Sequence, residues 1–397
     1  MSKNEKFRIS VTGCCLVDQL YSNISFTDPA ISHYFSKKKA DGGLTPGHLV
    51  FKEEFEEFCN EGFPEVLKKI TKGKKPDKIN LGGPGIVPLI HASQMLNATD
   101  TECRFYGCGG NDNDGKFIMS LLKKLNLPVN NYLLTGSITP STIVLSDPNY
   151  DEGHGERIFI NTIGAAWSYT PDQLDDNFFS SDVVVFGGTA LVPPIHDNLT
   201  ELLDKAKSKG CITIVNTVYD FRNEKLNPFG KWPLGKDDSS YKNIDLLMTD
   251  YEEALRLSGK KSLDAALNFF RELGTGAVIV TNGPNNLRGF SVNDSLFKEE
   301  KIIDLPVSKA IGAELQKGKA GDTTGCGDNF AGGVIANLVS QLQQGKIYPD
   351  LTESCAWGIV SGGYTCFYIG GTYFEEKPGE KLELITPFYE NYMKQIL

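Results

Sequence analysis

The second half of the chain alternates short apolar runs with segments of helical spacing, and this alternation limits the fold more than any other feature. From Asp182 onward the runs VVVFGG, ITIVNT, IDLLMTD and AVIVTNG each end in Gly, Asn, Thr or Asp, and helical periodicity follows. Such runs predict buried strands. Strands that alternate with helices form a mainly parallel sheet covered on both faces. The sequence therefore predicts an α/β protein with a three-layer αβα sandwich.

The first half adds strands and a small flap. RISVTGCCLVDQLY predicts the first strand and the loop that leaves it, and INLGGPGIVPLIHASQML predicts a strand, a turn and a helix. Residues 132–163 have the alternation of a hairpin, which would form a β lid. Residues 27–78 are polar and predict an insertion or lid extension, with one helical stretch from His48 to Ile70. No linker divides the chain, so we expect a single domain over residues 1–397.

Residues 319–339, KAGDTTGCGDNFAGGVIANLV, place a glycine turn directly before a helix. The first N–H groups of a helix lack intrahelical partners and lie at the positive end of its dipole. The amides of Gly325, Cys326 and Gly327 are therefore expected to form an anion hole for a phosphate or a developing oxyanion. Asp328, beside this pocket, is either a general base or only the N-cap of the helix.

Other polar and glycine residues follow the predicted strands. In a parallel sheet the ligand lies beyond the carboxyl ends of the strands, where the loops meet. Five positions fall at such ends: Asp18, Gly82, Gly83, Asp250 and Thr281. We therefore expect them to border one crevice together with the glycine turn.

The turn carries a resemblance to a known family. DTTGCGD, residues 322–328, resembles the D-T-x-G-A-G-D signature of the ribokinase-like sugar kinases, the PfkB carbohydrate kinase family, with Cys326 where alanine is usual. GCCLVD, LGGPG, GCGGNDNDG, GERIF, TDYEE and TNGPNN resemble further family motifs in the family's order. The resemblance covers nearly the whole chain except the insertion, and it implies a ribokinase-like fold.

The resemblance also implies an activity. It implies transfer of the γ-phosphoryl group of ATP to a sugar or sugar-like hydroxyl, assisted by Mg²⁺, with Asp328 as the base and the Gly325-Cys326-Gly327 amides as the anion hole. The implied binding residues are Asp18, Gly82 and Gly83 for the substrate, Thr281, Gly283 and Asn286 for the nucleotide, and Asp250 and Glu253 for the metal. A monovalent cation as a further cofactor, and a homodimer formed through the flap, stay open.

Each implied role has a structural alternative. Asp250 and Glu253 are also what a first helical turn favours, because carboxylates there interact well with the helix dipole. Asp18 would otherwise cap a helix or turn, and Gly82 and Gly83 would be needed only for the packing of a strand against a helix. TNGPNN would be a surface turn that binds no ligand. The family usually has a glycine where Asn286 stands, and Asn tolerates a left-handed backbone better than most residues.

One departure bears on the substrate. Val87 stands where the family commonly has an Asn that bonds a substrate hydroxyl. Either the substrate lacks that hydroxyl or another residue supplies the bond, because an unmatched buried polar group is costly.

Composition excludes several classes of function. A net charge of -10 and a pI near 5.2 argue against binding to nucleic acid, which needs clustered Lys and Arg. No apolar run reaches the length of a membrane helix, and the polar start MSKNEKFR is not a signal segment, so we expect a cytoplasmic protein without membrane contact. The nine cysteines are expected to be reduced thiols in that compartment.

Three functions are carried forward. A kinase that phosphorylates a small-molecule sugar is the first, and a nucleoside kinase of the same family, acting on an adenosine-like or inosine-like substrate, is the second. A non-catalytic sensor of a sugar or nucleotide is the third, although a sensor gains nothing from a base in line with a phosphate.

Overall fold

A nine-stranded sheet forms the body of the protein in the computed structural model, which describes residues 6–125, 127–153, 155–318 and 321–397. The strand order is β14-β13-β12-β11-β10-β9-β1-β5-β6, and β13 is antiparallel to both of its neighbours while the other pairs are parallel. The strands are β1 (Phe7–Gly13), β5 (Thr101–Gly110), β6 (Tyr132–Thr135), β9 (Val183–Gly187), β10 (Ile212–Asn216), β11 (Leu246–Asp250), β12 (Ala277–Thr281), β13 (Leu287–Ser291) and β14 (Glu300–Leu305).

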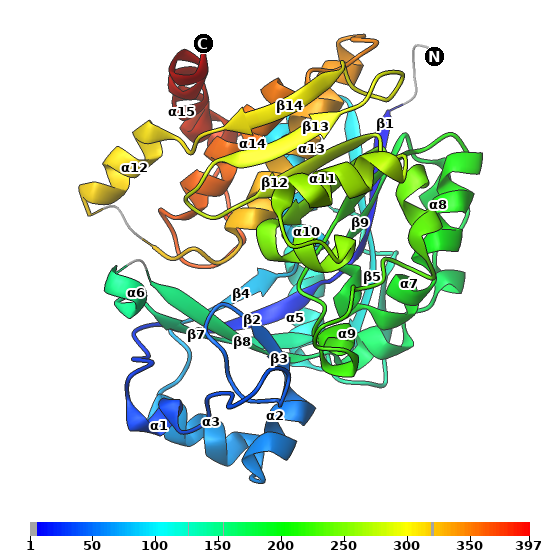
Figure 1. Cartoon of the computed structure of the whole chain (residues 1–397). Helices are drawn as coiled ribbons and strands as arrows, with labels where there is room; N and C mark the ends of the chain where they lie inside the picture. The colour runs from blue at the N-terminus through cyan, green and yellow to red at the C-terminus, as the bar shows by residue number, and fades with distance from the viewer. Residues whose placement is uncertain (1–5, 126, 154, 319–320) are drawn as a thin grey trace.

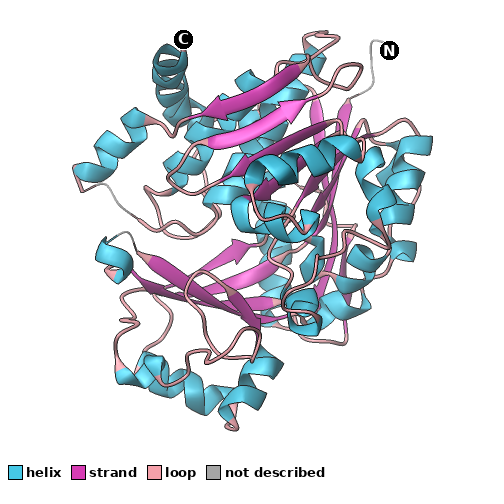
Figure 2. Ribbon diagram, in the orientation of Figure 1, coloured by secondary structure: helices cyan, strands magenta, loops and turns pink. Residues whose placement is uncertain are grey.

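Helices cover both faces of this sheet (Figure 2). Successive strand residues point to opposite faces, so Val183 and Val185 join one hydrophobic core while Val184 and Phe186 join the other. The first core includes helices α4 (Ile86–Met95), α5 (Asn113–Lys124), α12 (Lys309–Gln316), α13 (Cys326–Gln343), α14 (Leu351–Thr365) and α15 (Glu380–Ile396). The second includes α7 (Pro193–Asp197), α8 (Leu199–Ser208), α10 (Tyr251–Ser258) and α11 (Leu263–Glu272). The arrangement is a three-layer αβα sandwich.

A second, smaller sheet forms the lid, with strand order β3-β8-β7-β2-β4. Its strands are β2 (Leu16–Tyr21), β3 (Leu49–Phe51), β4 (Lys78–Gly82), β7 (Ser141–Asp147) and β8 (Glu156–Thr162). The run RISVTGCCLVDQLY, predicted as one strand and the loop that leaves it, contains two strands, β1 in the main sheet and β2 in the lid, joined through Cys14 and Cys15. This short connection places the lid at the carboxyl end of β1 (Figure 1).

Only part of the segment 132–163, which was predicted to form the lid hairpin, belongs to the lid. Of residues 132–163, β7 and β8 form the antiparallel hairpin of the lid, whereas β6 pairs with β5 in the main sheet. Strand β6 is parallel to β5, so it continues the main sheet and is not an arm of the hairpin.

Residues 27–78 contain α1 (Pro29–Ser32), β3, α2 (Lys52–Cys59) and α3 (Phe63–Thr71), and β4 begins at their end. The expected single helical stretch is broken because Asn60 has a left-handed backbone and Pro64 begins a new helix after Gly62. The three helices lie on the side of the lid sheet away from the main sheet (Figure 1). β3 adds an edge strand beside β8.

The segment 27–78 also contacts the body of the protein. His48 Nε2 lies 2.9 Å from Glu252 Oε2 at the start of α10, and the ring centroids of Phe51 and Phe221 are 5.1 Å apart. Phe221 begins the short helix α9 (Phe221–Leu226). The extension therefore connects the lid to the helices that follow β10 and β11.

Candidate active site

Helix α13 begins at the glycine turn. Gly325 is its N-cap residue, with a left-handed φ of 78°, and a side chain there would place its Cβ 2.3 Å from the Cα of Gly371. Only glycine satisfies both conditions. The N–H groups of Gly325 and Gly327 have no partner among the described residues, whereas the Cys326 N–H donates to Thr323 O at 3.3 Å. Two of the three expected anion-hole amides are therefore free, and the third is shared with the turn.

Asp328 stands in the first turn of α13, and it is not the N-cap, because Gly325 occupies that position. Its carboxylate has no hydrogen-bond partner among the described residues, and its side chain is half-buried. Burial raises the pKa of Asp328 to about 7, although the guanidinium of Arg157 opposes the shift. A partly dehydrated carboxylate with a pKa close to neutrality suits a general base.

Asp18 lies on β2 of the lid and is buried, with 6% of its surface exposed. Burial raises its pKa well above the usual range, and the charges of Asp328 and Asp322 raise it further. The carboxylates of Asp328 and Asp322, in the DTTGCGD turn, therefore lie near enough to Asp18 on β2 to act on its charge. The substrate role itself stays a prediction.

Gly82 ends β4 and Gly83 follows it, and each position requires glycine for a different reason. A Cβ on Gly82 would lie 1.9 Å from Asp18 Oδ2, so the carboxylate occupies the space where a side chain would stand. Gly83 has a φ of 112° and approaches the carbonyl of Cys14. Val87, the second residue of α4, is buried, and its Cγ2 would lie 3.6 Å from a Cβ built on Gly371. Val87 therefore presents an apolar side chain to the loop behind the anion hole.

Arg157 is a site residue that the sequence reasoning missed. It lies on β8 of the lid, and its positive charge lowers the pKa of Asp328, Cys326 and Cys366. Its Nε is buried without a partner among the described residues. The GERIF motif contains this arginine, but only the folded lid brings its charge near Asp328 and the two cysteines.

A buried polar network behind the turn was also missed. Asn329 donates from Nδ2 to the carbonyls of Gly325 and Gly371, each at 2.8 Å. Its Oδ1 accepts from Lys381 Nζ at 2.8 Å and from His91 Nδ1 at 2.9 Å. Lys381 is only 1% exposed, and burial lowers its pKa to about 7. The network orients the amide of Asn329 and so fixes the turn that carries Asp328.

The metal candidates form a capping box at the start of α10. Asp250 is the N-cap and accepts from the Glu253 N–H at 2.7 Å, while Glu253 Oε2 accepts from the Asp250 N–H at 3.4 Å. Glu253 is buried and also accepts from Thr217, and burial together with Asp250 raises its pKa to about 8. The structural alternative for this pair is therefore realised in the fold. In the described part of the chain no three His, Cys, Asp or Glu side chains group as metal ligands.

The nucleotide candidates lie at the end of β12. Thr281 is its last residue, Gly283 is left-handed with a φ of 52°, and a Cβ on Gly283 would meet open space. Asn286 donates from Nδ2 to Asp304 Oδ1 on β14 at 2.7 Å. Its φ is not positive, so this position does not need the usual glycine. The loop is open on the side of Gly283.

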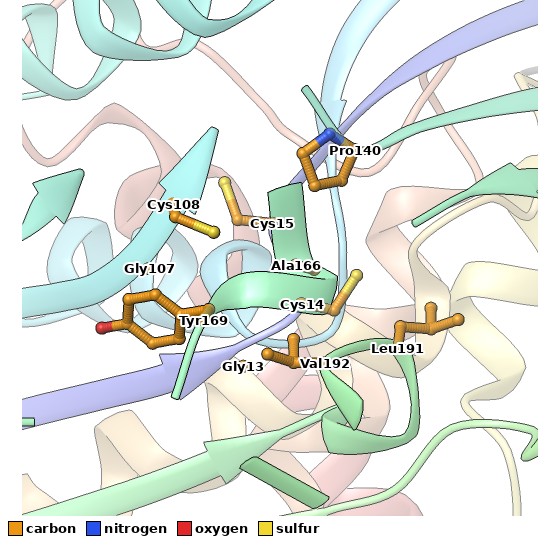
Figure 3. A pocket seen from close by; sticks show the side chains of 10 residues that line it. All are labelled: Gly13, Cys14, Cys15, Gly107, Cys108, Pro140, Ala166, Tyr169, Leu191 and Val192. Carbon is orange, nitrogen blue, oxygen red and sulfur yellow. The ribbon is translucent and has the colours of Figure 1, made fainter. Parts of the chain in front are cut away.

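A small pocket lies between the lid junction and the main sheet (Figure 3). Its walls are mostly apolar, and the junction of β1 and β2 supplies part of them. The lining residues are Gly13, Cys14, Cys15, Gly107, Cys108, Pro140, Ala166, Tyr169, Leu191 and Val192. Burial raises the pKa of Cys14 well above its usual range, and the charges of Cys15, Asp328 and Asp18 raise it further. Gly83 lies against Cys14 and Gly82 lies against Asp18, so the pocket adjoins the acidic site.

An electropositive helix start, a free carboxylate beside it and a lid that carries a second acid define a small-molecule phosphotransferase of α/β type. Residues 77–378 match the model of the pfkB family carbohydrate kinases. The chain belongs to this family, whose members are phosphotransferases with an alcohol group as acceptor.

Solved structures show the same ribokinase-like fold. The adenosine kinase of Schistosoma mansoni with 2-fluoroadenosine is 17% identical, with a TM-score of 0.68 over 94% of this chain and 98% of that one. The adenosine kinase of Sinorhizobium meliloti is 15% identical, with a TM-score of 0.68 over 96% and 99%. The ribokinase of Thermotoga maritima is 19% identical, with a TM-score of 0.61 over 97% and 100%.

The described helices include none that is both long enough and apolar enough to span a bilayer. All nine cysteines carry free thiols.

Proposed function

We propose that this chain transfers the γ-phosphoryl group of ATP to a hydroxyl of a small sugar or sugar-like substrate. The observation that supports the proposal is the half-buried Asp328 carboxylate beside the start of α13, whose pKa the Arg157 charge lowers and whose own charge raises the pKa of Asp18. Phosphoryl transfer needs positioning and charge stabilisation more than covalent chemistry, and this arrangement supplies both.

Each group has a distinct role in the proposed reaction. Asp18 orients the substrate by binding the substrate's hydroxyl groups. Asp328 accepts the proton of the hydroxyl that attacks the γ-phosphoryl group. The free amides of Gly325 and Gly327 stabilise the charge on the transferred group, and Arg157 adds a positive charge from the lid. Closing the lid removes water from this region, which strengthens each of these electrostatic interactions.

The family generally uses ATP and Mg²⁺, and the residues present fit them in part. When bound, Mg²⁺ would neutralise the charge on the phosphate oxygens and keep several of its waters. Asp250 is exposed and would bind such a hydrated ion, while Glu253 is already engaged and would orient Asp250. The nucleotide would lie along Thr281 and Gly283, where the loop is open, with Asn286 at its margin. A requirement for a monovalent cation, and a homodimer, stay predictions.

The test is ADP release, coupled to an indicator reaction, with a panel of sugars and nucleosides. We expect turnover with at least one sugar and a rate reduced by at least roughly a hundredfold in Asp328→Asn, with binding retained in calorimetry. The exposed Asp264, in the first turn of α11, gives the matched control Asp264→Asn. An Asp328→Asn variant that keeps the wild-type rate would show that Asp328 is not the base. A protein that binds a sugar or nucleotide but phosphorylates no substrate in the panel would instead support the non-catalytic sensor.

A nucleoside is the second candidate substrate, and the apolar pocket favours it. A sugar needs polar partners for its hydroxyls, whereas a base would lie against Cys108, Ala166, Tyr169 and Leu191. Val87 gives the site no polar group at the position where the family commonly has Asn. The similar structures include adenosine kinases solved with adenosine and 2-fluoroadenosine. If adenosine or inosine turns over while ribose and fructose are inert, the nucleoside replaces the sugar.

A further inference from the structure

Two thiols meet beside the anion hole. Cys326 is the first residue of α13, and Cys366 is the C-cap residue of α14, forty positions away. Their sulfur atoms lie 3.4 Å apart. The family usually has alanine at the position of Cys326, so a plain packing role would not require sulfur at this point.

Close helix packing holds the two sulfurs together. A Cβ on Gly362 of α14 would lie 2.8 Å from the Cys326 carbonyl oxygen, and one on Gly358 would lie 2.7 Å from Val334. The helices therefore approach each other along a glycine face, and a larger residue would force them apart. The backbone positions of the two cysteines are therefore held close together, because both helices are packed in the core.

The environment favours a reactive thiolate on Cys366. The two thiols share a hydrogen bond in which either sulfur can donate, and this bond together with the charge of Arg157 lowers the pKa of Cys366. Both cysteines are partly exposed. Cys59 is also partly exposed, but burial and two neighbouring glutamates raise its pKa to about 11. Thiolate character and access together decide which cysteine is oxidised first.

We infer that Cys326 and Cys366 form a site of reversible thiol oxidation whose substrate is hydrogen peroxide. The Cys366 thiolate attacks one peroxide oxygen, breaking the O–O bond and giving a sulfenic acid and, after protonation, water. The Cys326 thiol then attacks the sulfenic sulfur, forming the S–S bond and releasing a second water. The two thiols lose two protons and two electrons in total, and the peroxide is reduced to two waters.

The bond would alter the anion hole. A disulfide needs sulfurs about 2.05 Å apart, so the pair must close by about 1.4 Å. We expect the part of this approach that side-chain rotation does not supply to move the first turn of α13 toward α14. Gly325 and Gly327 flank Cys326 and move with it. Because a displacement of about 1 Å at such a site can cost about a hundredfold in rate, we expect at least a roughly tenfold loss of kinase activity. This effect on rate depends on the proposed function, whereas formation of the bond does not.

The experiment treats the reduced, full-length protein with hydrogen peroxide, blocks the remaining thiols with N-ethylmaleimide and maps the peptides by mass spectrometry. We expect the cross-linked peptide containing Cys326 and Cys366, with the loss of two hydrogen atoms, before any change at Cys59. Dithiothreitol should remove the cross-link. A map without this cross-link, or with Cys59 oxidised first, would overturn the inference.

Activity supplies the second readout, with each rate referred to the same protein before treatment. We expect the wild-type protein and the control Cys59→Ser to lose activity on oxidation and to regain it with dithiothreitol. Cys366→Ser should keep its own untreated rate, because it cannot form the bond. A Cys366→Ser variant as sensitive as the wild type contradicts the proposed site. If the wild type phosphorylates no substrate in the panel, the kinase proposal fails, and the peptide map still decides the oxidation site.

Discussion

Replacing Asp328 with Asn should stabilise the fold while it removes the activity. Burial raises the pKa of this carboxyl from 3.8 to about 7, so the folded protein binds the proton more tightly than the unfolded chain does. The folded state therefore loses stability as the pH rises from the unfolded pKa toward the folded one, and the loss is complete above the folded pKa. Asparagine has nearly the same shape and carries no charge at any of these pH values.

The shift sets the size of the effect. About three pKa units correspond to about 4 kcal/mol at most. Because the side chain is half-buried and solvent screens it, we expect roughly half, or about 2 kcal/mol, at pH 8. At pH 5 the wild-type carboxyl is largely protonated in the folded state, so the advantage of the variant should be less than half of that at pH 8.

Urea unfolding of both proteins at pH 5 and pH 8 measures this difference, with the slope of the transition as a check that the unfolded state has not changed. A parallel rate assay should show the loss of at least roughly a hundredfold that removal of a general base produces. If the two proteins differ by the same amount at both pH values, or if the variant is the less stable one at pH 8, then Asp328 is not strained by burial and the reasoning is wrong.

Three further predictions follow from the site. The rate should rise with pH through about 7, because Asp328 must lose its proton to act as a base. Arg157→Gln should move this inflection to higher pH, because the guanidinium lowers the pKa of Asp328. A pH–rate profile that is the same in both proteins would place Arg157 away from the base. Lys381→Met should lower kcat roughly tenfold and leave KM nearly unchanged, because the buried lysine donates to Asn329, which in turn donates to the glycine turn. An unchanged kcat in steady-state kinetics would refute this prediction. Gly82→Ala should weaken substrate binding, because the alanine Cβ would collide with Asp18. Gly312→Ala is the matched control, because a Cβ at that position meets open space. Equal substrate affinity of the two variants in calorimetry would contradict the packing argument.

Local chemistry allowed much of the body to be read from the residues alone. Each strand from Val183 to Thr281 is a short apolar run that ends at a polar or glycine residue, so the strand and its exit loop were both predictable. The start of α13 was predictable for the same reason, because an apolar stripe at helical spacing follows the glycine turn directly. The position of Asp328 within the first turn followed, although the residue at the N-cap proved to be Gly325.

Features of the lid were harder to predict. The run from Phe7 to Tyr21 has the same pattern in both of its strands, and nothing local indicates that the chain changes sheets at Cys14. β6 looks like the first arm of a hairpin in sequence, yet it pairs with β5 because a parallel edge was available there. Pairing partners are non-local, so propensity alone does not select them.

The sequence by itself determined the layered α/β body and the glycine turn with its acid, because strand and helix periodicity and helix-end chemistry act over a few neighbouring residues. Only the tertiary structure decided what surrounds that acid. Arg157 arrives from the lid, Lys381 from the last helix and Cys366 from the end of α14. Their effects depend on distance through space and on exclusion of water, which no local pattern encodes.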